Sequence, residues 1–143
     1  MQEALWPETP IRGITEVRVR VADTDLMGVV YNSNYLVWFE IGRTELLRDR
    51  GISYATVEAR GFSLPVTEAW FKVRRPARYD DLIRIETRVG LLRTRQVEFL
   101  YRLYSDQGLL VEGRTVHVPV THEGRAATLL PDWIAMALRL PKA

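Results

Sequence analysis

The sequence predicts a single α+β domain in which a five-stranded antiparallel sheet wraps around one long buried helix. Three observations lead to this prediction: an alternating strand near the start, one long helix whose first turns are apolar nearly all round, and four further strand-like segments joined mostly by short turns. Short connections favour antiparallel neighbours, and a sheet that curves around such a helix buries its apolar surface. The 143 residues contain no internal repeat or linker, so one domain over residues 1–143 is expected.

The first strand is predicted over residues 14–22, ITEVRVRVA. Its valines alternate with charged residues, which is typical of a half-buried strand. The loop DTDLMG follows, and its Gly28 permits backbone angles that other residues resist.

A helix of about five turns is predicted from Ser33 to Arg50. Apolar residues fill most of its circumference in the first turns, so the helix is expected to be buried. Asparagine and serine precede it as possible caps, and Gly51 follows its end. Glu40 lies in the apolar half, where a lone carboxylate is costly, so it is expected to have a partner or to face a pocket. Its spacing to Arg43 fits a simple helix ion pair, and a role in dimer contacts or in supporting a site stays open.

The remaining strands are rich in β-branched and aromatic residues. They are predicted over residues 64–73, 82–89, 96–104 and 109–120. The last of them shifts phase near Gly113, which predicts a bulge or bend there. A short helix is expected over residues 52–60, and Pro131 opens a last one. The apolar stripe of that last helix is predicted to contain Trp133, Met136, Ala137 and Leu140.

Charge and composition argue against several classes of function. The chain has 20 Lys and Arg against 18 Asp and Glu, and no basic run is longer than Arg74-Arg75, so nucleic-acid binding has little support. Cysteine is absent, which excludes disulfides, thiol catalysis and most structural zinc sites. Asp23 and Asp25 have no third or fourth ligand nearby in the sequence, so neither a metal nor another cofactor is expected.

No membrane association is predicted either. The first residues lack the basic start and apolar run of a signal peptide, and no stretch approaches the ~20 apolar residues of a membrane span. The expected location is therefore the cytoplasm.

One segment carries a resemblance to a known family. ADTDLMGVVYNSNYLVWFEIGRTELL resembles the hotdog-fold acyl-CoA thioesterases of the 4-hydroxybenzoyl-CoA thioesterase and YbgC-like group. Their pattern is roughly D-x-D-x-x-G-x-V-[YF]-x-x-x-Y, followed by an aromatic-rich helix with an acid and an arginine. The matching residues are Asp23, Asp25, Gly28, Val30, Tyr31, Tyr35, Phe39, Glu40 and Arg43. The similarity covers about residues 14–140, and GRTVHVPVTHEGRAATLLP resembles the family's last strand, turn and helix.

The resemblance implies both a fold and an activity. The implied fold is the hotdog fold, with a homodimer joined edge to edge, often a homotetramer, and a site near the subunit boundary. The implied activity is hydrolysis of an acyl-CoA to the free acid and CoA. In that family the second acid of the motif is the catalytic carboxylate, here Asp25, and the backbone N–H seven residues later polarises the thioester carbonyl, here Asn32. Many YbgC-like members have histidine at that place. This chain has asparagine there, so a role that depends on the imidazole is not expected.

The residues present suit this chemistry. A thioester releases a thiol with a pKa near 8.5, so a general acid is not essential. The reaction needs a nucleophile, for which Asp25 can act directly or through water, and N–H groups at a helix start to stabilise the oxyanion. The expected substrate-binding residues are Gly28, Tyr31, Tyr35 and, for the phosphates of CoA, Arg93 and Arg95.

Other interpretations stay open at this point. Asp25 could simply cap a turn, and for Asp23 this structural role is favoured. The chain could bind acyl-CoA without hydrolysing it. A hydratase or dehydratase is less favoured, because those hotdog enzymes use a histidine and residues 26–50 contain none. His117 and His122 are expected to be surface or strand residues.

Overall fold

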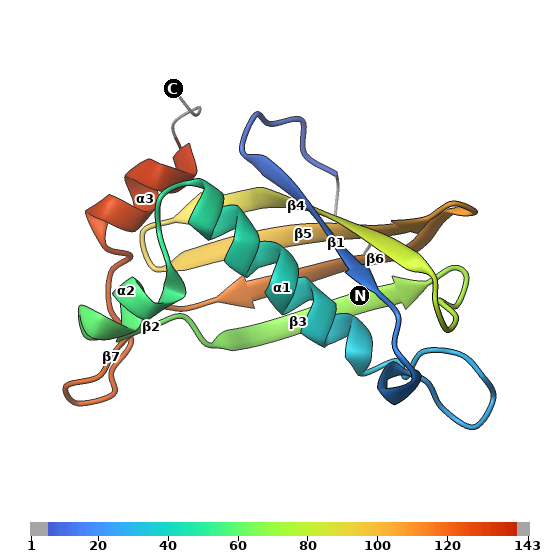
Figure 1. The fold of residues 1–143 in the computed structure, drawn as a ribbon. Coiled ribbons are helices and arrows are strands. Elements are labelled where there is room, and N and C mark those ends of the chain that lie inside the picture. Colours follow the sequence, from blue (N-terminus) through green and yellow to red (C-terminus); the bar gives the residue numbers. More distant parts are fainter. Residues whose placement is uncertain (1–5, 140–143) are drawn as a thin grey trace.

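The computed structural model describes residues 6–139 and has the predicted α+β hotdog architecture, a five-stranded antiparallel sheet crossed on one face by a long helix (Figure 1). The strand order is β1-β4-β5-β6-β3. The strands are β1 (Arg12–Arg18), β3 (Val66–Val73), β4 (Leu82–Arg93), β5 (Gln96–Ser105) and β6 (Gly108–His117). Strands β1 and β3 are the two edges of this sheet.

The long helix α1 (Asn34–Asp49) confirms the predicted helix within one residue at either end. It ends where Gly51 takes a positive φ of 86° and its N–H bonds to the carbonyl of Arg48, as expected of a glycine that follows a helix. The smaller elements are the 3-10 turn η1 (Val21–Asp23), α2 (Tyr54–Ala59), α3 (Asp132–Arg139) and a two-stranded sheet of β2 (Phe62–Ser63) and β7 (Val120–Thr121).

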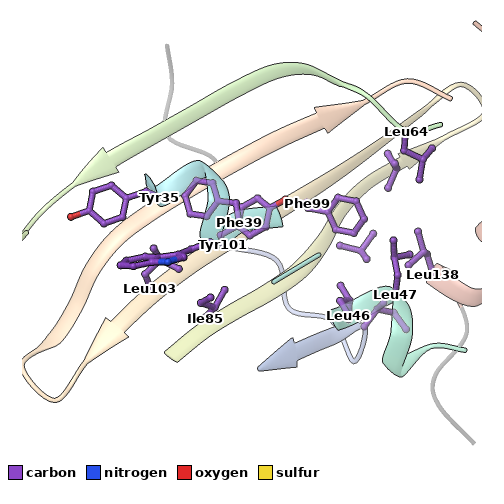
Figure 2. Close-up of a cluster of buried hydrophobic side chains, with 14 of the residues drawn as sticks. Tyr35, Phe39, Leu46, Leu47, Leu64, Ile85, Phe99, Tyr101, Leu103 and Leu138 are labelled. Carbon is purple, nitrogen blue, oxygen red and sulfur yellow. The ribbon is translucent and has the colours of Figure 1, made fainter. Parts of the chain in front are cut away.

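The core lies between one face of α1 and the sheet, as Figure 2 shows. The ring of Phe39 stacks on Tyr101 at 4.3 Å between centroids. Helix and sheet approach so closely here that a Cβ at Gly113 would overlap the ring of Phe39, and one at Gly42 would overlap Thr87. Both glycines therefore set the distance between the two layers.

The prediction that α1 is buried all round is wrong for the single chain. Tyr35, Phe39 and Leu46 are buried against the sheet, whereas Val37 is 49% exposed and Glu40 is also exposed. The reason is that one sheet covers only one side of a helix. The expectation that Glu40 has a partner or faces a pocket is confirmed by its position in the lining of a cavity, and its carboxylate forms no ion pair within residues 6–139.

Three further details differ from the sequence prediction. The first strand ends at Arg18, and Val21 is 71% exposed in η1 because the chain already turns there. The β5–β6 register shifts between Leu103 and Tyr104, which leaves Leu110 of β6 unmatched, so the irregularity is not at Gly113. In α3 the predicted Met136 is 57% exposed, and Ile134 and Leu138 are buried in its place. Leu140 lies outside the described residues.

The two ends of α1 carry different structures (Figure 1). At its start, the loop of residues 24–31 lies beside the β3–β4 connection, because Val30 N–H donates to the Ala77 carbonyl at 2.9 Å. At its end, Arg50 Nε donates to the Ala137 carbonyl of α3, and Leu130 N–H just before α3 donates to Thr94 O in the β4–β5 turn. The two ends therefore expose different sets of candidate residues.

Candidate active site

The loop between η1 and α1 folds back on itself as a tight turn. Asp25 N–H donates to the Val29 carbonyl at 2.8 Å, Thr24 forms a bridge with Val30, and Tyr31 N–H donates to the Asp23 carbonyl at 3.0 Å. We call residues 23–32 the Asp25 turn. The two halves of this turn place Asp25 beside the residues that lead into α1.

Gly28 makes this turn possible. Its φ is +79°, a backbone conformation that residues with a Cβ rarely adopt. No atom lies within 4 Å of the position that a Cβ would occupy, so the requirement for glycine comes from the backbone angle and not from crowding.

Asp25 holds the turn with one of its two carboxylate oxygens. Oδ1 accepts the N–H of Met27 at 2.8 Å and that of Val29 at 3.3 Å. This is the turn-capping role that the sequence left open. Oδ2 accepts no hydrogen bond from any residue between 6 and 139 and is therefore available to a water molecule or a thioester. The carboxylate is thus fixed in place and still has one free oxygen.

The start of α1 offers a free backbone donor. The N–H groups of Asn34, Tyr35 and Leu36 donate to the carbonyls of residues 31, 32 and 33. The N–H of Asn32 donates to no group in the described part of the chain, and Asn32 is exposed. A helix start carries a partial positive charge, so this donor suits a developing oxyanion. The side chain of Asn32 is not the cap of the helix, since Ser33 occupies that position.

Asp23 connects the strand to the helix start. Its side chain is 4% exposed and accepts the backbone N–H of Arg20 at 2.8 Å and Nη2 of Arg20 at 2.9 Å, while its carbonyl accepts from Tyr31. Hydrogen bonding from Arg20 lowers the pKa of Asp23, although burial opposes this. The structural role expected for Asp23 agrees with these contacts.

The two predicted tyrosines occupy different environments. Tyr31 is 50% exposed on the turn. Tyr35 is fully buried beneath it, and its hydroxyl oxygen accepts the N–H of Ala77 at 3.1 Å. Burial raises the pKa of Tyr35, the hydrogen bond from Ala77 lowers it, and the negative charge of Asp25 raises it further. Tyr35 is therefore within electrostatic reach of Asp25 but forms part of the wall behind the turn.

The arginines predicted to bind CoA phosphates lie far from the Asp25 turn of the same chain. Arg93 and Arg95 are exposed at the β4–β5 turn, beside Thr94, which is bonded to the segment before α3. The β3–β4 connection instead places Arg78 next to the Asp25 turn through a bridge to Val29. Sequence reasoning missed Arg78, because only the pairing of two loops reveals it.

A cavity of about 350 Å³ opens on the exposed side of α1, nearer its end. It lies between α1, α2, the segment before β3 and the sheet. Its lining residues are Glu40, Arg43, Thr44, Leu47, Tyr54, Leu64, Pro65, Val66, Phe99 and His117. The sequence predicted a pocket for Glu40 only as one of two alternatives and did not predict the rest of this cavity, because its walls come from five separate segments.

His117 is a buried wall of this cavity and not a surface residue. It is 1% exposed, and burial lowers its pKa to about 4, so the ring is neutral near pH 7. Nδ1 lies 2.9 Å from the carbonyl oxygen of Leu64 and must carry the proton. Nε2 therefore accepts from Thr115 Oγ1 at 2.8 Å, and Thr115 in turn accepts from the Tyr101 hydroxyl at 2.6 Å. This row of bonds fixes His117 as a structural group.

His122 belongs to a separate surface cluster with Ser63 and Glu58. Its Nε2 lies 2.9 Å from Ser63 Oγ and 2.8 Å from Glu58 Oε2. A catalytic triad needs the serine and the acid on opposite ring nitrogens. Both contacts here use the same nitrogen, so the cluster links α2, β2 and β7 and does not activate the serine.

Neither a metal centre nor a membrane span is found in the described part of the chain. Within residues 6–139, no group of three or more His, Cys, Asp or Glu side chains is arranged to hold a metal ion. None of the helices in the same range is long and apolar enough to span a bilayer.

Comparison with known proteins gives one consistent group. Residues 19–138 match the model of the "Thioesterase-like superfamily". YneP of Bacillus subtilis is 32% identical over 82% of this chain and 89% of its own. The acyl-CoA thioester hydrolase YbgC of Escherichia coli is 32% identical over 71% of this chain and 76% of its own. The DHNA-CoA thioesterase of Staphylococcus aureus superposes with a TM-score of 0.83 at 29% identity, covering 88% of this chain and 87% of that one.

Proposed function

The chain belongs to the thioesterase-like superfamily, and we propose that it hydrolyses acyl-CoA thioesters at the Asp25 turn. It is an acyl-CoA thioester hydrolase that yields a free acid and CoA, like the relatives whose names state this activity. The observation that carries the site is the combination in one turn of a fixed carboxylate with one free oxygen and a free backbone N–H at the start of α1.

The proposed reaction needs only these two groups. The thioester carbonyl oxygen accepts the N–H of Asn32, which stabilises the negative charge as the carbon becomes tetrahedral. Oδ2 of Asp25 removes a proton from a water molecule that attacks the carbon, or attacks the carbon itself to form an anhydride that water then opens. In either case the C–S bond breaks, and CoA leaves as a thiolate that takes up a proton from solvent.

The two routes differ in the origin of one oxygen atom. If water attacks directly, both oxygens of Asp25 remain its own. If an anhydride forms, hydrolysis can leave a solvent oxygen in the Asp25 carboxylate. Mass spectrometry of the protein after a single turnover in ¹⁸O water distinguishes the routes.

Substrate contacts follow from the position of the turn. Gly28 and the half-exposed Tyr31 belong to the same turn as Asp25, and we propose that they contact the substrate there, whereas the buried Tyr35 supports the turn. Arg93 and Arg95 remain the proposed phosphate-binding residues, and they can reach a CoA molecule at an Asp25 turn only if that turn belongs to another copy. The proposed site is therefore shared between subunits.

A homodimer, or a homotetramer built from it, supplies that arrangement. Strand β3 is a sheet edge, and an antiparallel pairing of two β3 edges places the start of one strand beside the end of the other. The Asp25 turn is bonded to residues just after the end of β3. The turn of one copy thus comes close to the cavity near Val66 of the other. The cytoplasmic location likewise stays a prediction.

Replacement of Asp25 by asparagine tests the proposed function. The amide oxygen introduced by Asp25→Asn can still accept the N–H groups that hold the turn, but an amide is a poor base and nucleophile. We expect thiol release from a panel of acyl-CoAs to fall by about 10²–10⁴-fold in this variant. Asp106→Asn, in the exposed β5–β6 turn, is the matched control and should keep full activity.

Two outcomes would contradict this account. Equal thiol release by the native chain and Asp25→Asn would remove Asp25 from the mechanism. If the native chain binds acyl-CoAs across a broad panel but releases no thiol from them, the non-catalytic binding module is favoured. Asp25 would then only hold the turn in place.

A further inference from the structure

We propose that the acyl group carries an oxygen acceptor, a carboxylate or a hydroxyl, and that Arg43 binds this acceptor in the cavity beside α1. Arg43 would then determine the acyl specificity of the enzyme. This inference rests on the proposed hydrolysis, because it assigns the cavity to the substrate's acyl part.

The cavity is apolar apart from a few polar positions. Leu47, Leu64 and Phe99 form much of its wall, and its volume of about 350 Å³ suits a group of small-molecule size. Such walls favour a hydrocarbon or aromatic acyl group. In pockets of this kind, one or two polar groups determine which ligand is preferred.

Arg43 is the cationic group in this lining. Its side chain is half-buried, and no carboxylate within residues 6–139 lies at ion-pair distance from it. Its neighbour is the neutral Tyr101 hydroxyl, which supplies no counter-charge. A guanidinium withdrawn from water without a counter-charge is unfavourable, and a carboxylate or another oxygen acceptor is its natural complement. Glu40 also lines the cavity but is exposed and does not pair with Arg43.

Three polar groups in the row beside the cavity have no hydrogen left for a ligand. The Tyr101 hydroxyl donates to Thr115, the Thr115 hydroxyl donates to His117, and His117 Nδ1–H donates to the carbonyl of Leu64. All three donors are therefore engaged within the protein. Arg43, next to the Tyr101 hydroxyl of the same row, is then the charged donor for an acceptor in the cavity, and the hydroxyls of Thr44 and Tyr54 are neutral groups in the same lining.

The cavity is placed to receive an acyl group from the partner's Asp25 turn. Within one chain, Arg43 lies about 14 Å along α1 from Asn34 at 1.5 Å per residue, which is too far for a short acyl group. In the proposed β3-paired dimer, the other copy's turn lies beside Val66, which itself lines the cavity. The reacting carbonyl and Arg43 then lie at two ends of one acyl site.

The test uses three acyl-CoAs of equal chain length: hexanoyl-CoA, 6-hydroxyhexanoyl-CoA and the mono-CoA ester of adipic acid. For the native protein we expect kcat/KM for at least one oxygen-bearing substrate to exceed that for hexanoyl-CoA at least tenfold. In Arg43→Met, which keeps the length of the side chain, this ratio should fall to about one, and Arg43→Lys should retain part of it. Arg48→Met, on the exposed face of α1, should behave as the native protein.

A ratio near one in the native protein, or a ratio that Arg43→Met does not change, would overturn the inference. Which of the two oxygen-bearing substrates is preferred decides between a carboxylate and a hydroxyl. Binding of the matching thioethers, which lack the reactive carbonyl, gives the same comparison without turnover. If the native protein binds an oxygen-bearing thioether more tightly than the hexyl thioether but hydrolyses none of the three acyl-CoAs, the proposed function is contradicted. The proposed role of Arg43 would still stand.

Discussion

Two residues show how far a side chain's role depends on its surroundings. Asp25 and His117 both have hydrogen bonds that fix the orientation of their side chains. Asp25 keeps one oxygen free at an exposed turn, whereas both ring nitrogens of His117 are engaged inside the fold. We therefore propose a catalytic role for Asp25 and a structural role for His117.

The burial of His117 predicts a pH dependence of stability. Burial, aided by the positive charge of Arg43 and opposed by the bond to Leu64, lowers its pKa to about 4 from an ordinary value of 6.5. The unfolded chain therefore binds a proton between pH 6.5 and 4 that the folded chain does not. This stability is fully present above pH 6.5 and is lost as the pH falls toward 4, by about 2 kcal/mol between pH 7 and pH 5.

Denaturant unfolding at pH 7 and pH 5 measures this loss. His117→Gln should reduce the difference between the two pH values by about 2 kcal/mol. His122→Gln is the matched substitution at an exposed histidine, and it should change the difference less than His117→Gln does. Equal pH dependence of native protein and His117→Gln would contradict a neutral buried imidazole.

At the level of elements, the sequence predicted most of what local pattern determines. The bounds of α1 follow from its helical spacing and Gly51, and the five strands follow from their composition and turns. The alternation that begins at Val111 also places His117 on the inner face, because residues 111, 113, 115 and 117 all face inward. The assumed bulge at Gly113 hid this signal.

What the sequence could not predict depends on contacts between distant segments. The exposure of Glu40 follows from a sheet that covers one side of α1 only. The place of Arg78 beside the Asp25 turn follows from a single bridge between two loops. The sequence therefore predicted candidate site residues in one turn, on α1 and at Arg93 and Arg95, without the neighbours that the fold brings to the turn.

The conformation of the Asp25 turn predicts the effect of Gly28→Ala. A residue with a Cβ at φ +79° strains the backbone by about 1–2 kcal/mol, and the turn can relieve this strain by moving Asp25 away from the helix start. We expect kcat to fall at least tenfold, with a loss of unfolding free energy of about 1 kcal/mol.

Gly124→Ala is the control for that experiment. Gly124 has a φ of +74° in an exposed turn between β7 and α3, so its substitution introduces the same strain elsewhere. It should cost similar stability and leave kcat unchanged. Equal kcat in Gly28→Ala and native protein would show that the geometry of the turn does not limit the reaction.

The surface of the whole molecule supports the proposal that each chain supplies one half of a shared site. The sheet has two edges. Several large apolar side chains are exposed around the Asp25 turn and on the outer face of α1. These side chains are Leu26, Met27, Tyr31, Leu36 and Val37. A second copy can cover them and complete the acyl site.

Light scattering tests this prediction of a homodimer or homotetramer. At micromolar concentration we expect a mass of two or four times 16.5 kDa. Val66→Lys and Val73→Pro at the β3 edge should shift the mass toward one chain, and thiol release should fall with it. A stable and active monomer of 16.5 kDa would contradict a shared site.

The central claim is that the free oxygen of Asp25 and the N–H of Asn32 act on the same carbonyl group. A crystal structure with a non-hydrolysable ketone analogue of an acyl-CoA, in which a methylene group replaces the sulfur, measures this directly. We predict that the analogue's carbonyl oxygen accepts the N–H of Asn32 at about 2.7–3.1 Å, with Oδ2 of Asp25 facing the carbonyl carbon directly or through one water molecule. A carbonyl bound away from the start of α1, or an Asp25 carboxylate that faces away from it, would contradict the account.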